Sequence, residues 1–136
     1  MINEKDIRWK QRFQNFEKAY NTFDRILKIP NPNEAEKMGL IQAFEIVFEL
    51  AWKTIKDYLM ELGFDEKSPR DALKQAYQSG IITEGHTWME ALSNRNETVH
   101  TYDDKLAEEM DNKIREKYFP VISNLYFYLK KEYNSE

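Results

Sequence analysis

The longest helical pattern in the sequence runs from Glu34 to Leu62, and it constrains the fold more than any other feature. Apolar residues recur there every three or four positions, which places them on one broad face of an α-helix. These residues are Leu40, Ile41, Phe44, Val47, Phe48, Ala51, Trp52, Ile55, Leu59 and Leu62. A helix of this length extends on the order of 40 Å, which suits a bundle whose helices pack lengthwise.

The segment before it has the same character. Its apolar residues alternate steps of four and three, which is the seam of a helix that packs along other helices. They are Trp9, Phe13, Phe16, Tyr20, Phe23 and Leu27. Pro30 and Pro32 end this first helix, because the residue before a proline is disfavoured in the helical conformation. Asn33 and Glu36 then have the spacing of a capping box that opens the long helix, and Gly63 closes it.

Three further helices follow from similar signals. Ser68 and Pro69 open a shorter helix that ends at Gly80, and Thr83 is the predicted cap of a fourth helix. Asp103 or Asp104 starts a final helix, which Pro120 should kink or divide. No segment has the alternating pattern of a strand. The sequence therefore predicts an all-α, antiparallel up-and-down bundle of four to five helices, without a sheet, as one domain over residues 1–136.

Composition excludes several classes of function. The formal charge of -4 provides no overall basic field, so neither a general nucleic-acid coat nor a DNA partner is expected. The chain has no cysteine, which rules out disulfides and thiolate metal sites. No run approaches the roughly 18 apolar residues of a membrane span, and the start MINEKDIRWK lacks the core of a signal peptide. We expect a cytoplasmic protein with no membrane partner.

The stretch SNRNETVHTYDD, residues 93–104, interrupts the apolar seam of the fourth helix with Arg95. On a helix Asn96 and His100 are four positions apart and share a face, whereas Arg95 lies about 100° away on the side of the apolar seam. One interpretation is structural: the arginine lies along the seam and pairs with Glu45 or Glu49 of the long helix. The other is that these polar groups form a functional site.

A resemblance favours the second interpretation. RNETVHTYD resembles the R-x4-H-x-Y signature of the HEPN superfamily, as found in HepT-type toxins. Together with IQAFEIVFELAWK, it makes the chain similar to the nucleotidyltransferase substrate-binding protein family, whose members resemble the helical domain of kanamycin nucleotidyltransferase. The resemblance implies a helical bundle that is commonly a homodimer and is bound by a separate minimal nucleotidyltransferase.

The HepT-type resemblance also implies an activity, namely metal-independent cleavage of RNA by the motif arginine and histidine. By position these are Arg95 and His100. The motif tyrosine, here Tyr102, would accept AMP from the partner and so silence the toxin. No cofactor is implied, and no metal-ligand spacing such as H-E-x-x-H occurs in the chain.

The chemistry of these side chains agrees with the implied roles. Cleavage without metal needs a base near neutral pH for the 2'-hydroxyl, and an unperturbed histidine titrates near 6.5. A fixed guanidinium can bind the growing negative charge on the phosphorane oxygens. The leaving oxygen also needs a proton, which the His100 of a twofold-related subunit could supply. Asn96 would orient the imidazole or contact phosphate.

Two alternatives belong to other classes of function. In the first, the bundle is a non-catalytic substrate-binding subunit of a two-component nucleotidyltransferase, and Arg95, Asn96 and His100 bind an anion or shape the interface. In the second, the chain is a structural dimerisation bundle. In neither does the chain transfer nucleotides by itself, because it lacks the G-S-x(n)-D-x-D pattern that holds magnesium and triphosphate.

Overall fold

The computed structural model describes residues 4–98 and 104–135, and over these residues the chain is helical with no strand. The helices are α1 (Glu4–Leu27), α2 (Glu34–Glu61), α3 (Pro69–Gln78), α4 (Gly85–Thr98), α5 (Asp104–Lys113), a π-helical turn η1 (Ile114–Tyr118) and α6 (Phe119–Asn134). The predicted all-α bundle is confirmed. None of the helices within the described ranges is long and apolar enough to cross a membrane.

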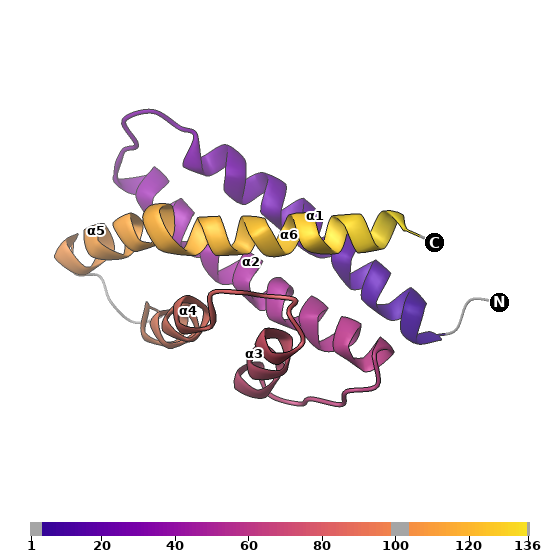
Figure 1. Ribbon diagram of the computed structural model, residues 1–136. Helices are drawn as coiled ribbons and strands as arrows, with labels where there is room; N and C mark the ends of the chain where they lie inside the picture. Colours follow the sequence, from indigo (N-terminus) through magenta and orange to yellow (C-terminus); the bar gives the residue numbers. More distant parts are fainter. Residues whose placement is uncertain (1–3, 99–103, 136) are drawn as a thin grey trace.

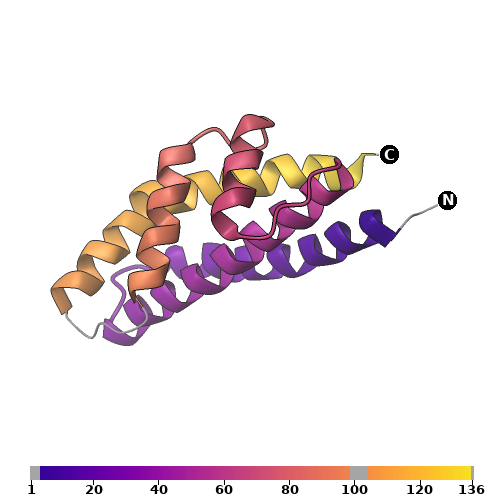
Figure 2. The same ribbon diagram turned by 90° about the horizontal axis from the view of Figure 1, so that it is seen from below.

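The long helices form the body of the bundle. Helices α1 and α2 run antiparallel, and the continuous α5–η1–α6 segment packs on both of them (Figure 1). The short helices α3 and α4 are seen nearly end-on in Figure 1, and Figure 2 shows them side by side on one flank of the long helices. Helix α2 contacts α1, α3, α5 and α6, whereas α4 packs on α3 and η1.

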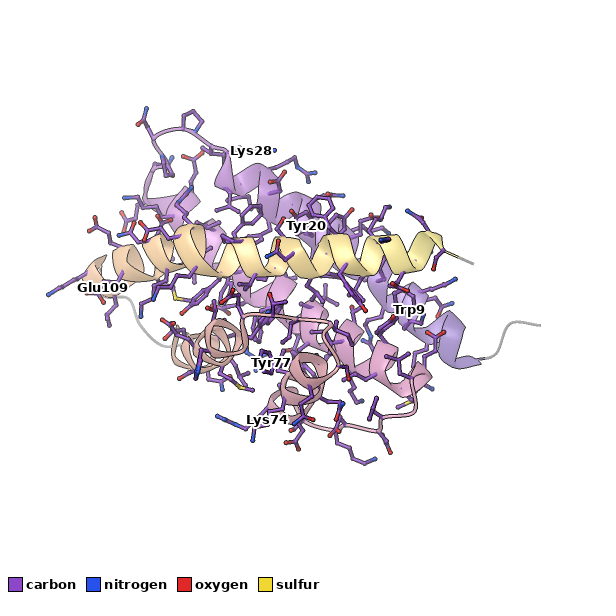
Figure 3. The ribbon with its side chains drawn as sticks, in the orientation of Figure 1. Trp9, Tyr20, Lys28, Lys74, Tyr77 and Glu109 are labelled. Atoms are coloured by element: carbon purple, nitrogen blue, oxygen red, sulfur yellow. The ribbon has the colours of Figure 1, made fainter. Side chains whose placement is uncertain are left out.

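The core is aromatic and follows the predicted seams. Trp9 and Tyr20 lie along the contact between α1 and α6 (Figure 3). The Tyr20 and Tyr126 rings stack with centroids 4.2 Å apart, and Phe13 stacks on Tyr126 at 5.8 Å. Most of the predicted α2 face is also buried. Ile41 is only partly buried, and Leu62, which directly follows the last residue of α2, is 49% exposed.

The predicted helix ends are mostly confirmed. The Asn33 side chain accepts from the Glu36 backbone N–H and the Glu36 side chain accepts from the Asn33 N–H, which completes the capping box. The Ser68 side chain accepts from the Asp71 backbone N–H and so caps α3. The Thr83 prediction is wrong by one residue: α4 begins at Gly85, so Glu84 directly precedes the helix and its carbonyl accepts the first bond, from the Trp88 N–H.

The predicted interruption near Pro120 takes the form of a π-helical turn. There the Phe119 N–H donates to the Ile114 carbonyl, one residue further back than in an α-helix. A proline in an α-helix removes one hydrogen bond and its ring meets the carbonyl four residues earlier. The wider turn absorbs this conflict, so the helix continues through Pro120 as α6.

Ion pairs tie the long helices to one another. Arg12 of α1 donates to the buried carboxylate of Asp57 on α2 at 3.0 Å. Glu17 of α1 accepts hydrogen bonds from Lys130 and the Tyr126 hydroxyl of α6 at 2.7 and 2.6 Å. These two bonds outweigh the effect of burial and lower the pKa of Glu17. The contacts fix how α1 lies against its neighbours.

Candidate functional site

Arg95 lies in the last turn of α4, where it continues the seam formed by buried Trp88 and Leu92. Its side chain is only 22% exposed. The guanidinium carbon is 5.7 Å from the centroid of the Phe48 ring on α2, which is a cation–π distance. The arginine can therefore interrupt an apolar stripe because its charged group rests on an aromatic face while one part of it reaches the surface.

Glu49 holds this guanidinium. Nη1 of Arg95 donates to Oε2 of Glu49, the residue next to Phe48 on α2. The same oxygen accepts from the Trp52 indole N–H at 3.1 Å, and Oε1 lies 3.1 Å from the Lys53 ammonium group. Burial opposes ionisation of Glu49, but the hydrogen bonds from Trp52 and Lys53 and the charge of Arg95 outweigh it and lower the pKa of the carboxyl. The structural interpretation offered Glu45 or Glu49 as the partner of Arg95, and the structure pairs it with Glu49.

Asn96 occupies a different edge of the same guanidinium. Its side-chain oxygen accepts from Nε of Arg95 at 3.3 Å and from Nη2 at 3.0 Å. Asn96 is exposed, and its amide is neutral. Arg95 is thus bound by a carboxylate on one side and by a surface amide oxygen on the other.

These groups border an open groove between α2 and the end of α4. The groove has a volume of about 610 Å³, and its lining consists of Glu45, Ile46, Glu49, Leu50, Arg95 and Asn96. Ile46 is 50% exposed and provides an apolar rim. Four of the six predicted site residues therefore meet at one place, with a cation, two carboxylates and an amide around an accessible space.

His100 and Tyr102 lie outside the described residues, so their predicted roles stay predictions. The described part of the chain resumes at Asp104, the first residue of α5, close to the boundary that the sequence indicated. His86, the other histidine, is exposed near the start of α4. Within residues 4–98 and 104–135, no three histidine or carboxylate side chains gather where they could hold a metal ion.

Two features near the site were not predicted. The sequence pattern places Trp52 on the apolar face of the long helix, whereas its indole N–H also donates to Glu49. The spacing of Glu49, Trp52 and Lys53, three and four positions apart on one helix, could have indicated that both donors reach the same carboxylate. The Asn94 amide donates to the hydroxyl of buried Tyr118 in the π-helical turn. That long-range contact has no local signal in the sequence.

Known proteins resemble this chain in sequence and in fold. Residues 11–131 match the family described as nucleotidyltransferase substrate binding protein like. The probable ribonuclease HepT of Haemophilus influenzae (strain ATCC 51907 / DSM 11121 / KW20 / Rd) is 35% identical over 74 residues, which are 51% of this chain and 51% of that protein. The chain thus spans about half the length of the curated relative that it matches.

Solved structures share most of the bundle. A crystal structure of a Thermus thermophilus protein has a TM-score of 0.75 and 27% identity, covering 88% of this chain and 99% of that one. A chain of a mutant MntA-HpeT toxin–antitoxin complex has a TM-score of 0.72 and 12% identity, covering 95% of this chain and 99% of that one, which shows a common fold. Since the family match reaches from α1 into α6, the chain belongs to the nucleotidyltransferase substrate-binding protein family.

Proposed function

We propose that the chain is a HepT-type toxin, a HEPN-like subunit that partners a separate minimal nucleotidyltransferase and cleaves RNA without metal. The observation that carries this proposal is the position of Arg95, held by Glu49 and resting on Phe48 at the border of an open groove. Arg95 is partly exposed at that border, so its charge is accessible from the groove. The likeness to a probable ribonuclease HepT supports the same function.

In the proposed reaction His100 acts as the base that removes the proton from the RNA 2'-hydroxyl. The 2'-oxygen then attacks the neighbouring phosphorus, and the bond to the 5'-oxygen breaks. Arg95 donates hydrogen bonds to the phosphorane oxygens, whose negative charge grows in the transition state. The leaving 5'-oxygen takes a proton from His100 of the second subunit, so the active form is a homodimer built around α4.

The first experiment measures RNA cleavage in the presence of a chelator, with the wild type, His100→Ala, Arg95→Ala and a monomeric variant. The monomeric variant has its substitution outside the groove lining and is shown to be a single subunit by sedimentation. We expect cleavage by the wild type only, with losses of about 100-fold or more in the variants. Equal cleavage by all four proteins would rule out the proposal.

The second experiment tests the partner. The chain is incubated with the neighbouring nucleotidyltransferase and ATP and is then weighed. We expect a mass increase in units of AMP, together with loss of RNA cleavage. Tyr102→Phe should gain no mass and should stay active. An equal mass increase in the variant would place the modification elsewhere.

A non-catalytic substrate-binding subunit is the second candidate. It is favoured by the two carboxylates, Glu45 and Glu49, which line the groove beside Arg95 and make the site less attractive to RNA than a basic cleft. In that case the groove would bind part of the partner's substrate. No cleavage and no mass increase, with a partner activity that depends on Arg95, would favour this function.

A further inference from the structure

The guanidinium of Arg95 is held along two different edges by groups of different strength. Nη1 is bound by the Glu49 carboxylate, whereas Nε and Nη2 share the amide oxygen of Asn96. Nε and Nη2 together form a parallel pair of donors that matches two oxygens of a phosphate group. One edge of Arg95 is therefore tied to the long helix α2, and the edge suited to phosphate is occupied by a surface side chain.

Glu49 is well placed to serve as a fixed support. Its carboxylate accepts from Trp52 and from Lys53 on its own helix as well as from Arg95. The Trp52 side chain is packed in the core at 9% exposure, so the indole N–H has little freedom to move. The Glu49 carboxylate therefore has two donors on its own helix besides Arg95.

Asn96 has the opposite character. It is exposed, it follows Arg95 directly in the chain, and its neutral oxygen accepts two bonds of ordinary length, 3.0 and 3.3 Å. A charged oxygen is about twice as strong an acceptor as a neutral one. A phosphate entering the groove would therefore replace Asn96 on Nε and Nη2, and the asparagine side chain can rotate into solvent.

We infer that Glu49 is the positioning residue of the site and that the Nε/Nη2 edge of Arg95, covered by Asn96 in the resting state, is the phosphodiester-binding edge. This inference rests on the proposed function and deepens it. Glu49 does not touch the substrate. It holds the Arg95 guanidinium on the Phe48 ring before RNA binds, so binding does not have to restrict the rotation of the arginine side chain. In the resting state the side-chain oxygen of Asn96 occupies the position that a phosphate oxygen takes when RNA is bound.

The inference predicts how Glu49 variants cleave RNA. Glu49→Gln and Glu49→Ala should lower kcat by about 10- to 100-fold, with a smaller rise in KM. The phosphorane carries more negative charge than the bound phosphodiester, so a misplaced arginine weakens the binding of the transition state more than the binding of the substrate. Glu49→Asp should recover part of the loss. The matched control is Glu17→Gln, which removes a paired carboxylate on α1 outside the groove lining and should leave kcat unchanged.

A competing role for Glu49 gives the opposite result. If the carboxylate merely competed with phosphate for Arg95, Glu49→Gln would remove a negative charge from the groove, lower KM and raise kcat. That outcome would overturn the inference. So would equal kcat values in wild type and Glu49→Gln, measured well below the melting temperatures of both proteins.

Direct binding tests the role of Asn96 without any cleavage. The probe is a fully 2'-O-methylated oligoribonucleotide, which cannot be cleaved because its 2'-oxygens are blocked. In nitrogen-15 spectra of the full chain, we expect the Nε resonance of Arg95 to shift on binding. Asn96→Asp should weaken binding about fivefold, because a fixed carboxylate competes for the same edge, whereas Asn96→Ala should tighten it.

The two sets of results separate this inference from the proposed function. A wild type that cleaves RNA but is unaffected by Glu49→Gln would refute the positioning role and leave the ribonuclease proposal standing. A wild type that cleaves no RNA, with an Arg95 Nε resonance that still shifts and still responds to Asn96→Asp, would refute the ribonuclease and keep the phosphodiester edge. An Nε resonance that does not respond to the probe would refute that edge.

Discussion

The ion pair between Arg12 and Asp57 predicts different losses of stability when one or the other partner is removed. The Asp57 side chain is 3% exposed, whereas that of Arg12 is 37% exposed, and the Arg12 Nε lies 3.0 Å from the carboxylate. Removing the cation leaves a buried negative charge without its partner. Removing the anion leaves an arginine that can turn toward water. We therefore expect Arg12→Met to cost more stability than Asp57→Asn.

The size of the effect follows from the burial of the pair. Breaking a fully buried ion pair by removing one member costs about 3–5 kcal/mol. Water has partial access through Arg12, so we expect about 2–4 kcal/mol for Arg12→Met and about 1 kcal/mol for Asp57→Asn. In a chain of this size each kcal/mol lowers the Tm by roughly 3–4 °C, so Arg12→Met should melt roughly 7–14 °C below the wild type.

Thermal and urea unfolding followed by circular dichroism would measure these differences. Arg8→Met is the matched control, because Arg8 is an exposed arginine on the same helix whose contact, at 3.9 Å, is with the sulfur of Met60. Its change should stay within about 0.5 kcal/mol. The double variant Arg12→Met, Asp57→Asn should be more stable than Arg12→Met alone. The reasoning fails if Arg12→Met melts with the control or if the second substitution gives no recovery.

Three further variants test other parts of the bundle. Glu17→Gln should lower the Tm at neutral pH by removing the bond to Lys130, and the difference from wild type should vanish as the pH falls through the lowered pKa of Glu17, below its ordinary value of 4.5. Phe44→Ala should cost about 3–5 kcal/mol in urea unfolding, because Phe44 is fully buried against Tyr118. Asn33→Ala should cost about 0.5–2 kcal/mol in the same assay by removing the cap of α2.

Features that depend on near neighbours in the chain could be predicted from the sequence. The aromatic seam of α1 and the capping box at Asn33 are both set by spacings of three or four residues, and both are confirmed. The start of α4 could not be located as well, because Thr83 has a capping side chain while the structure begins the helix after Glu84. A short loop offers several such residues, and packing decides among them.

The candidate site was predictable only in part. The apolar seam around Arg95 indicated a carboxylate of the long helix, Glu45 or Glu49, and the structure selects Glu49. Which edge of the guanidinium that carboxylate takes, and that Phe48 lies beneath it, depend on how α4 crosses α2. The spacing of residues along the sequence does not determine where or at what angle two helices cross. The groove likewise arises from the packing of two helices and has no counterpart in a single segment.

Because of the π-helical turn before Pro120, the number of residues in the α5–η1–α6 segment and the presence of a proline at position 120 depend on each other. A π turn corresponds to one additional residue within an α-helix whose flanks keep their places. Deleting one residue between Ile114 and Tyr118 would restore regular α geometry while α5 and α6 stayed in register, but the proline ring would then meet a carbonyl one turn back. In related chains we expect that single-residue deletion to occur together with replacement of the proline.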